Sequence, residues 1–233
     1  MAEYLIQDTT LTALADVIRE KTGSTEAISP EEMSKAIGDI KVDDGSFVGL
    51  ISGTSKHINI PQGITAIRPY AFYNFSNLFS VKIPDGVTDV GSGAFRDCSV
   101  LQSLTLPNSV TSIGTSTFTG CKLLLSFIIP DSVTTIGSSG FGDGVFAQCT
   151  GLRTVTIGKN VERISGPMFY GCTALRTVIF RGTPDIAQQS GAYPFLGLTG
   201  LDDIYVPWSE GQVAGAPWGA TNATIHYNSK VED

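Results

Sequence analysis

The stretch LPNSVTSIGTSTFTGC at residues 106–121 repeats the layout of IPDGVTDVGSGAFRDC at residues 83–98. Each begins with an apolar residue and a proline, continues through two apolar residues at a spacing of three, and ends in Phe-x-x-Cys. An internal period of this kind is interpreted before any single residue, because a repeat determines the architecture of the whole chain. When the copies are aligned on the proline, Pro61, Pro84, Pro107 and Pro130 follow one another at intervals of 23 residues.

The same register continues beyond the fourth copy with different residues in the proline position. These are Gly158, Arg181 and Pro207, at intervals of 28, 23 and 26 residues. The five extra residues of the fourth copy are assigned to an insertion near Gly140–Val145.

Each copy contains L-x-x-V-x-I followed by V-x-x-I and a phenylalanine. The period-2 alternation and the β-branched residues predict a short strand with one face toward a core. The V-x-x-I and Phe positions are assigned to the return side of each coil. One coil cannot bury these side chains alone, so the pattern predicts stacked coils with a continuous core. The leucine position is occupied by Leu78, Leu101, Leu124, Leu152, Leu175 and Leu201.

The four cysteines share one position of the repeat, 14 residues after the proline position once the insertion is allowed for. They are Cys98, Cys121, Cys149 and Cys172. Phe75 occupies this position in the first copy, and Cys often behaves as a small buried hydrophobe, so buried free thiols are predicted. Neighbouring strands about 4.8 Å apart would also permit disulfides. No metal site is expected, because His57 and His226 lie outside this column.

This pattern resembles the BspA-like leucine-rich repeats of bacterial surface proteins. Residues 101–121, LQSLTLPNSVTSIGTSTFTGC, match the motif L-x-x-I-x-I-P-x-S-V-x-x-I-G-x-x-A-F-x-x-C nearly throughout, and the resemblance covers about residues 58–206. It implies an α/β repeat solenoid of about seven coils that binds proteins or cell surfaces and has no catalytic residues to transfer. The departures are Gly158, the degenerate copy VIFRGTPDIAQQSGAYPF and the lack of a recognisable signal peptide.

The repeat divides the chain into residues 1–45, 46–206 and 207–233. In the first segment, Leu11, Leu14, Ala15 and Ile18 form one apolar helix stripe, and SPEE at 29–32 forms a capping box for a second helix. These helices either cap the first coil or attach the protein to another structure. The segment 1–40 is similar to the amino-terminal segments of tail-associated proteins of prophages in gut Firmicutes, and APWGATNATIHYN at 216–228 is similar to their carboxyl ends. The last segment is expected to be irregular and to close the solenoid with tryptophan.

Composition and charge narrow the range of functions. The formal net charge is −7 and the pI is about 4.8, and the 15 basic residues are scattered along the sequence, so no nucleic-acid partner is expected. Two histidines in distant segments provide no positioned base, and Asp202 and Asp203 are adjacent on a strand, where successive side chains point to opposite faces. The sequence therefore predicts a protein that is not an enzyme and has no cofactor.

The amino terminus lacks the basic and apolar regions of a signal peptide, and no stretch reaches 18 apolar residues. The sequence predicts a phage virion tail or cytoplasmic location, with a route to the cell surface other than Sec. The favoured function is a binding module on a phage tail or similar particle. The alternative is a bacterial surface adhesin or a general protein-interaction domain.

The positions between the buried ones should point outward from the strands. They are mostly polar, but several are apolar, which is either ordinary surface composition or a recognition face for a protein or a cell-surface glycan. The binding strip predicted from these positions is Lys82, Leu125, Ile128, Arg153, Arg176, Ile179 and Tyr205.

Overall fold

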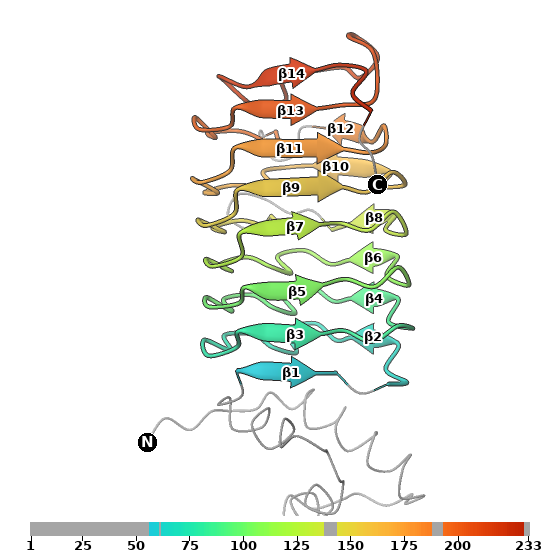
Figure 1. Cartoon of the computed structure of the whole chain (residues 1–233), viewed down its shortest axis with the longest axis vertical. Coiled ribbons are helices and arrows are strands. Elements are labelled where there is room, and N and C mark those ends of the chain that lie inside the picture. The colour runs from blue at the N-terminus through green and yellow to red at the C-terminus, as the bar shows by residue number, and fades with distance from the viewer. Residues whose placement is uncertain (1–55, 61, 138–143, 188–192, 231–233) are drawn as a thin grey trace, which may run out of the picture.

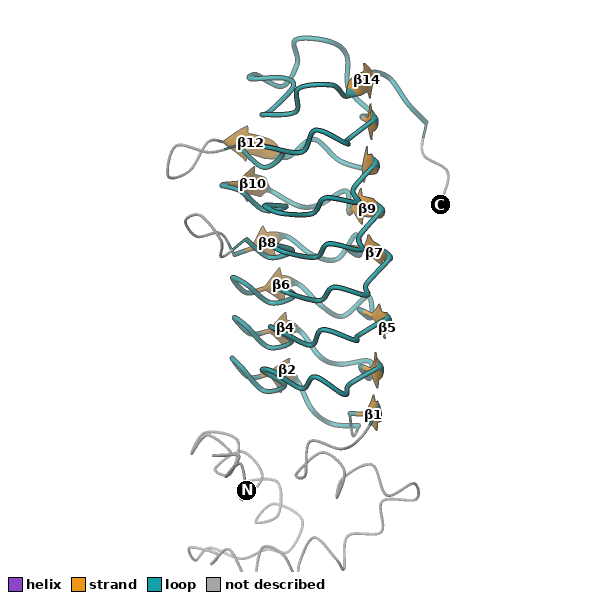
Figure 2. Ribbon diagram, turned by 90° about the vertical axis from the view of Figure 1, so that its left-hand side faces the viewer, coloured by secondary structure: helices purple, strands orange, loops and turns teal. Residues whose placement is uncertain are grey.

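A computed structural model describes residues 56–60, 62–137, 144–187 and 193–230. They form a straight stack of coils with short strands along two opposite sides (Figures 1 and 2). The predicted helices in residues 1–45 and the inserted residues 138–143 lie outside the described residues.

One side of the stack carries eight parallel strands, one from each successive coil (Figure 1). They pair in the orders β1-β3-β5 and β7-β9-β11-β13-β14. Residues 23 apart lie opposite each other in the first coils, as in Ile58↔Val81 and Val81↔Leu104. The strands are β1 (His57–Asn59), β3 (Ser80–Lys82), β5 (Ser103–Thr105), β7 (Ser126–Ile128), β9 (Thr154–Ile157), β11 (Thr177–Phe180), β13 (Asp203–Tyr205) and β14 (Thr224–His226).

The return side carries shorter parallel strands in the orders β2-β4-β6-β8 and β10-β12 (Figure 2). Their inward residue is the isoleucine or valine that ends V-x-x-I, such as Val90 and Ile113. The strands are β2 (Ala66–Ile67), β4 (Asp89–Val90), β6 (Ser112–Ile113), β8 (Thr135–Ile136), β10 (Arg163–Ser165) and β12 (Asp185–Ala187).

The α/β class predicted from the resemblance is corrected for the described part of the chain, which contains strands and turns but no helix. Paired strands repeat about every 4.8 Å, whereas a helix with its side chains is about 10 Å wide. Glycines after the return strands bring successive coils too close for a helix: a Cβ on Gly114 would collide with the backbone of Ser92 in the preceding coil. The return side therefore stays as narrow as the strand side, and the stack is straight.

The core lies between the two strand stacks, and the predicted apolar positions fill it. All six residues of the leucine position are fully or almost fully buried. The phenylalanines form a continuous stack, with ring centroids 5.7 Å apart for Phe95 and Phe118 and 5.5 Å apart for Phe118 and Phe146. The stack extends to Phe72 at one end and Phe195 at the other. Each coil thus buries its aromatic ring against its neighbours.

The four cysteines are buried free thiols, as predicted. Each thiol donates a hydrogen bond to the carbonyl oxygen of the phenylalanine one coil earlier, for example Cys149 to Phe118 at 3.0 Å. Burial raises the pKa of Cys98 and Cys172 to about 12. It also raises the pKa of Cys121 and Cys149 well above the ordinary value.

The departures from the repeat have steric and electrostatic explanations. Gly144 and Val145, assigned above to the insertion, belong to the regular coil: Val145 is fully buried, and its carbonyl oxygen accepts a hydrogen bond from the Phe118 amide. Gly158 replaces proline because a Cβ there would collide with the Pro130 carbonyl oxygen. Arg181, in the same column, forms an ion pair with Asp131.

Two tryptophans close the carboxyl end of the core. The Trp218 ring is fully buried, and its Nε1 donates a hydrogen bond to the Ala214 carbonyl oxygen at 2.8 Å. Trp208 packs edge-on against Phe180 with centroids 5.3 Å apart. The carboxyl-terminal segment, which begins at residue 207, is less irregular than expected, because β14 adds one more strand to the sheet. Its inward residue, Ile225, continues the apolar column and favours this pairing.

Candidate functional site

The outward side of the β1-to-β14 stack is called the strand face below. It contains the residue just before each strand and the strand residues on either side of the buried one. All seven residues of the predicted binding strip lie on this face. Lys82, Leu125, Ile128, Arg153 and Arg176 are exposed, and Ile179 and Tyr205 are half-buried. Folding thus brings together side chains that span more than 120 residues of sequence.

From β7 to β13, one row of the strand face is largely apolar. The backbone register places Thr156 between Ile128 and Ile179, and places Tyr205 beside Ile179. Ile128 is 57% exposed. Thr156 was expected to be exposed but is buried, because the longer isoleucine side chains lie on both sides of it. The row therefore presents aliphatic side chains without a polar gap.

A second row contains Leu125, Arg153 and Arg176 in consecutive coils. The Arg153 amide donates to the Leu125 carbonyl oxygen, and the Arg176 amide donates to the Arg153 carbonyl oxygen. The guanidinium of Arg176 donates to the carbonyl oxygens of Thr173, Leu175 and Gly200 at 3.0–3.2 Å. Arg176 therefore joins two coils, whereas Arg153 makes no ion pair with a described residue.

The sequence interpretation missed a third outward row. It is formed by the residue that stands one position before the buried residue in each strand. It consists of His57, Ser80, Ser103, Ser126, Thr154, Thr177, Asp203 and Thr224. The period-2 pattern L-x-x-V-x-I implied this row, because both neighbours of a buried strand residue point outward.

Histidines flank the strand face at both ends. His226 Nε2 lies 2.7 Å from Asp203 Oδ1, and its ring stacks on Tyr205 with centroids 4.4 Å apart. At the first coils, His57 Nδ1 lies 2.7 Å from Ser80 Oγ, and the ring packs edge-on against Phe79. Each histidine thus packs against an aromatic side chain, although Phe79 stays 38% exposed. The His57 ring has a hydroxyl partner but no described carboxylate partner, and the His226 ring has a carboxylate partner but no described hydroxyl or thiol partner, so neither pair forms the order of a catalytic triad among the described residues.

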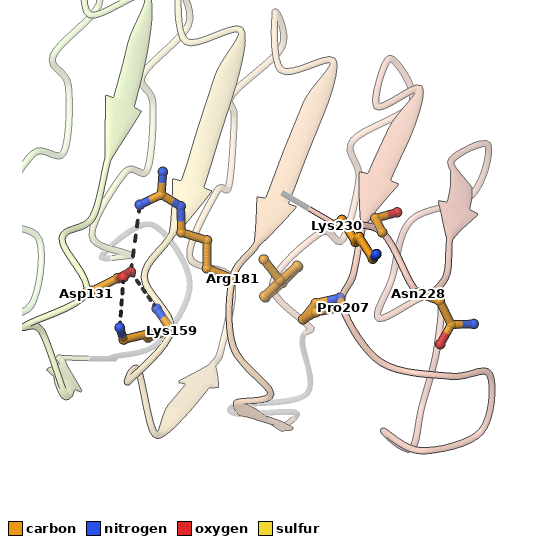
Figure 3. A pocket seen from close by; sticks show the side chains of 8 residues that line it. Asp131, Lys159, Arg181, Pro207, Asn228 and Lys230 are labelled. Carbon is orange, nitrogen blue, oxygen red and sulfur yellow. Dashed lines mark hydrogen bonds and ion pairs between the residues drawn. The ribbon is translucent and has the colours of Figure 1, made fainter. Parts of the chain in front are cut away.

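A hollow of about 540 Å³ lies at the corner where the β7, β9, β11, β13 and β14 coils leave the sheet (Figure 3). Asp131 is its central charge: its carboxylate accepts a hydrogen bond from the Lys159 amide and forms ion pairs with Lys159 and Arg181 at 3.5 and 3.8 Å. Asn228 and Lys230 form the opposite wall (Figure 3). The ion pairs link three coils, and the single carboxylate of Asp131 compensates one of the three positive charges of Lys159, Arg181 and Lys230.

Among the described residues, no three His, Cys, Asp or Glu side chains form a group that could hold a metal ion. Likewise, no helix among the described residues is long and apolar enough to span a membrane.

Parallel coils, a leucine-lined core and a regular outward strand face define a leucine-rich-repeat solenoid. The family model described as BspA type leucine rich repeat region matches residues 41–143 and 140–210 in six copies, and the chain belongs to this family. A search of curated proteins finds no match.

The structure is similar to solved structures of bacterial proteins. The pneumococcal vaccine antigen PcpA is 23% identical with a TM-score of 0.60, over 76% of this chain and 42% of PcpA. The chain thus corresponds to less than half of that protein. A leucine-rich-repeat protein of T. pallidum is 23% identical with a TM-score of 0.47, over 57% of this chain and 72% of that one. A leucine-rich cell surface protein of Faecalibacterium prausnitzii is 19% identical with a TM-score of 0.42, over 78% of this chain and 62% of that one.

Proposed function

We propose that the protein is a non-enzymatic recognition module that binds a protein or cell-surface ligand through its strand face. The single observation that carries this proposal is the strand face itself, where exposed side chains from successive coils form a fixed array. Backbone pairing already orders this array, so binding to it costs little conformational entropy. The contact strip proposed is Lys82, Leu125, Ile128, Arg153, Arg176, Ile179 and Tyr205.

Two settings suit such a module. On a phage tail, residues 1–40 would attach the protein to other tail proteins and the strand face would bind the host surface. The alternative is a bacterial surface adhesin, as the description of the Faecalibacterium relative suggests. We favour the tail, because both termini resemble tail-associated proteins. Detection of the chain in purified induced particles supports the tail, and its presence on intact producing cells but not in particles supports the adhesin.

Substitution of the strand face tests the recognition function. Arg153→Glu combined with Ile128→Asp should abolish binding to particles or cells without unfolding the chain, because both side chains are exposed. A matched variant that removes residues 139–143 restores the 23-residue period and should still bind. Loss of binding in this deletion variant, together with full binding by the double variant, would refute the strand face as the site.

Residues 1–40 are proposed as the attachment segment. A chain that begins at Ser46 should remain monomeric with an unchanged melting transition, because the repeat provides its own core. Aggregation of this shortened chain would show that the segment caps the first coil instead.

A further inference from the structure

The charges of the chain are segregated in a way that the net charge of −7 conceals. Residues 1–55 contain ten acidic and four basic residues. The described residues contain nine acidic and eleven basic residues, which gives this part of the molecule a formal charge of +2. The described part of the molecule therefore carries a slight positive charge although the whole chain is acidic.

From β1 to β11 the strand face contains lysine and arginine but no aspartate or glutamate. Lys82 and Arg153 are exposed and form no ion pair with a described residue. On the other surfaces some cations have acidic partners, as in Arg163–Asp185 at 3.4 Å and Lys159–Asp131 at 3.5 Å, whereas Lys122 and Lys230 form no ion pair with a described residue. Lys82 and Arg153 are thus uncompensated positive charges on a part of the strand face that has no acidic residue.

Exposed aliphatic side chains lie among these cations. Leu125, directly beside Arg153 in the neighbouring coil, is 52% exposed, and Ile128 is 57% exposed. Leu123, at the corner that leads into β7, is 42% exposed. Together, Lys82, Leu123, Leu125, Ile128 and Arg153 are called the basic-apolar patch.

The composition of this patch determines the chemistry of a complementary partner. Uncompensated cations favour carboxylates, and exposed leucine and isoleucine side chains gain free energy when apolar side chains cover them. A glycan would instead favour exposed aromatic faces, but the basic-apolar patch contains no aromatic side chain and the Tyr205 ring stacks on His226. Lys82 and Arg153 are three coils apart and three residues apart along the strand direction, which together make about 17 Å, a distance that about five residues of extended peptide span.

We propose that the partner of the strand face is a protein, an inference that rests on the proposed function of this face. The basic-apolar patch binds a segment of that protein that carries both acidic and apolar side chains. The probe is a random library of twelve-residue peptides selected on the full chain. The enriched peptides should have a net negative charge and at least two large apolar residues. Their affinity should fall at least tenfold in the Lys82→Glu, Arg153→Glu variant and should weaken as salt is added.

The matched control is Arg163→Glu combined with Lys230→Glu, which changes the net charge equally but lies off the strand face; it should bind the peptides as the unaltered chain does. Enrichment of neutral or basic peptides, no enrichment, or equal binding by the Lys82, Arg153 variant would overturn the acidic-peptide proposal. A parallel array of acidic and neutral glycans gives a separate outcome. Acidic glycans that bind through Lys82 and Arg153, without peptide enrichment, would overturn the protein partner but leave the strand face as the recognition site. The proposed function itself would be refuted only if the Arg153→Glu, Ile128→Asp variant still bound cells or particles as the unaltered chain does.

Discussion

The thiol of Cys121 donates a hydrogen bond to the carbonyl oxygen of Phe95, one coil earlier, at 3.2 Å. The same bond recurs at Cys98, Cys149 and Cys172 with acceptors at 3.0 Å. Each cysteine therefore acts both as a small apolar side chain and as a donor to a carbonyl group inside the core. This double role explains why the column contains free thiols and not disulfides.

Thiol titration should count no reactive thiol in the native protein and four in the denatured, unreduced protein. The native thiols are buried and protonated, and only the thiolate reacts rapidly. A denatured count below four would show that part of the column forms disulfides.

Stability should fall as the pH rises above 9. The ordinary thiol pKa is 9.0, and burial raises it to about 12 for Cys98 and Cys172. Between these values the unfolded chain loses thiol protons that the folded chain keeps, so the free energy of unfolding decreases by about 1.4 kcal/mol per thiol and pH unit. Urea unfolding at pH 8 and pH 10 measures this loss. The Cys98→Ala, Cys172→Ala variant should lose less unfolding free energy between pH 8 and pH 10. An identical pH dependence in both proteins would show that the thiols do not cause the loss.

Two adjacent isoleucines should differ sharply in their contribution to stability. Ile129 is fully buried and Ile128 is 57% exposed. Ile129→Ala should lower the free energy of unfolding by about 2–5 kcal/mol because it leaves a cavity. Ile128→Ala should change it by less than about 0.5 kcal/mol. Chemical denaturation of both variants checks this, and similar losses would mean that the inward and outward positions are wrongly assigned.

The stability of the carboxyl end of the solenoid should depend on Trp218. Trp218→Ala removes a fully buried ring that packs against Phe180 and Phe195, and should cost about 3–5 kcal/mol. Because repeat stability is mostly a sum of nearest-neighbour terms, hydrogen exchange should accelerate at β13 and β14 and stay slow at β3 and β5. Uniform acceleration along the whole solenoid would show that the end does not unfold as a local unit.

The sequence was sufficient to predict the coils because each buried position recurs in register. Leu101, Val110 and Phe118 could be placed in the core by their spacing alone. The absence of a return-side helix was harder to predict, because it depends on how closely the backbones at Gly114 and Ser92 approach. The burial of Thr156 depends on the length of its neighbours in adjacent coils, and these neighbours are 28 and 23 residues away in sequence.

The candidate site was predictable in position but not in charge. The outward positions of Lys82 and Arg153 follow from the strand period. The lack of acidic partners for these two residues does not follow from the strand period, because ion pairs such as Lys159–Asp131 form between coils and across an insertion. The stacking of His226 on Tyr205 was also missed, because β14 departs from the repeat in sequence and follows β13 after 21 residues instead of 23.

Side-chain oxidation footprinting of the protein, free and bound to intact bacterial cells or particles that retain it, tests recognition by the strand face most directly. Leu125 and Ile128 are 52% and 57% exposed on this face, and Tyr70 and Tyr170 are 45% and 41% exposed away from it, so both sets react in the free protein. The account predicts that binding protects Leu125 and Ile128 and leaves Tyr70 and Tyr170 as reactive as before. Protection of the two tyrosines, with Leu125 and Ile128 unchanged, would contradict it.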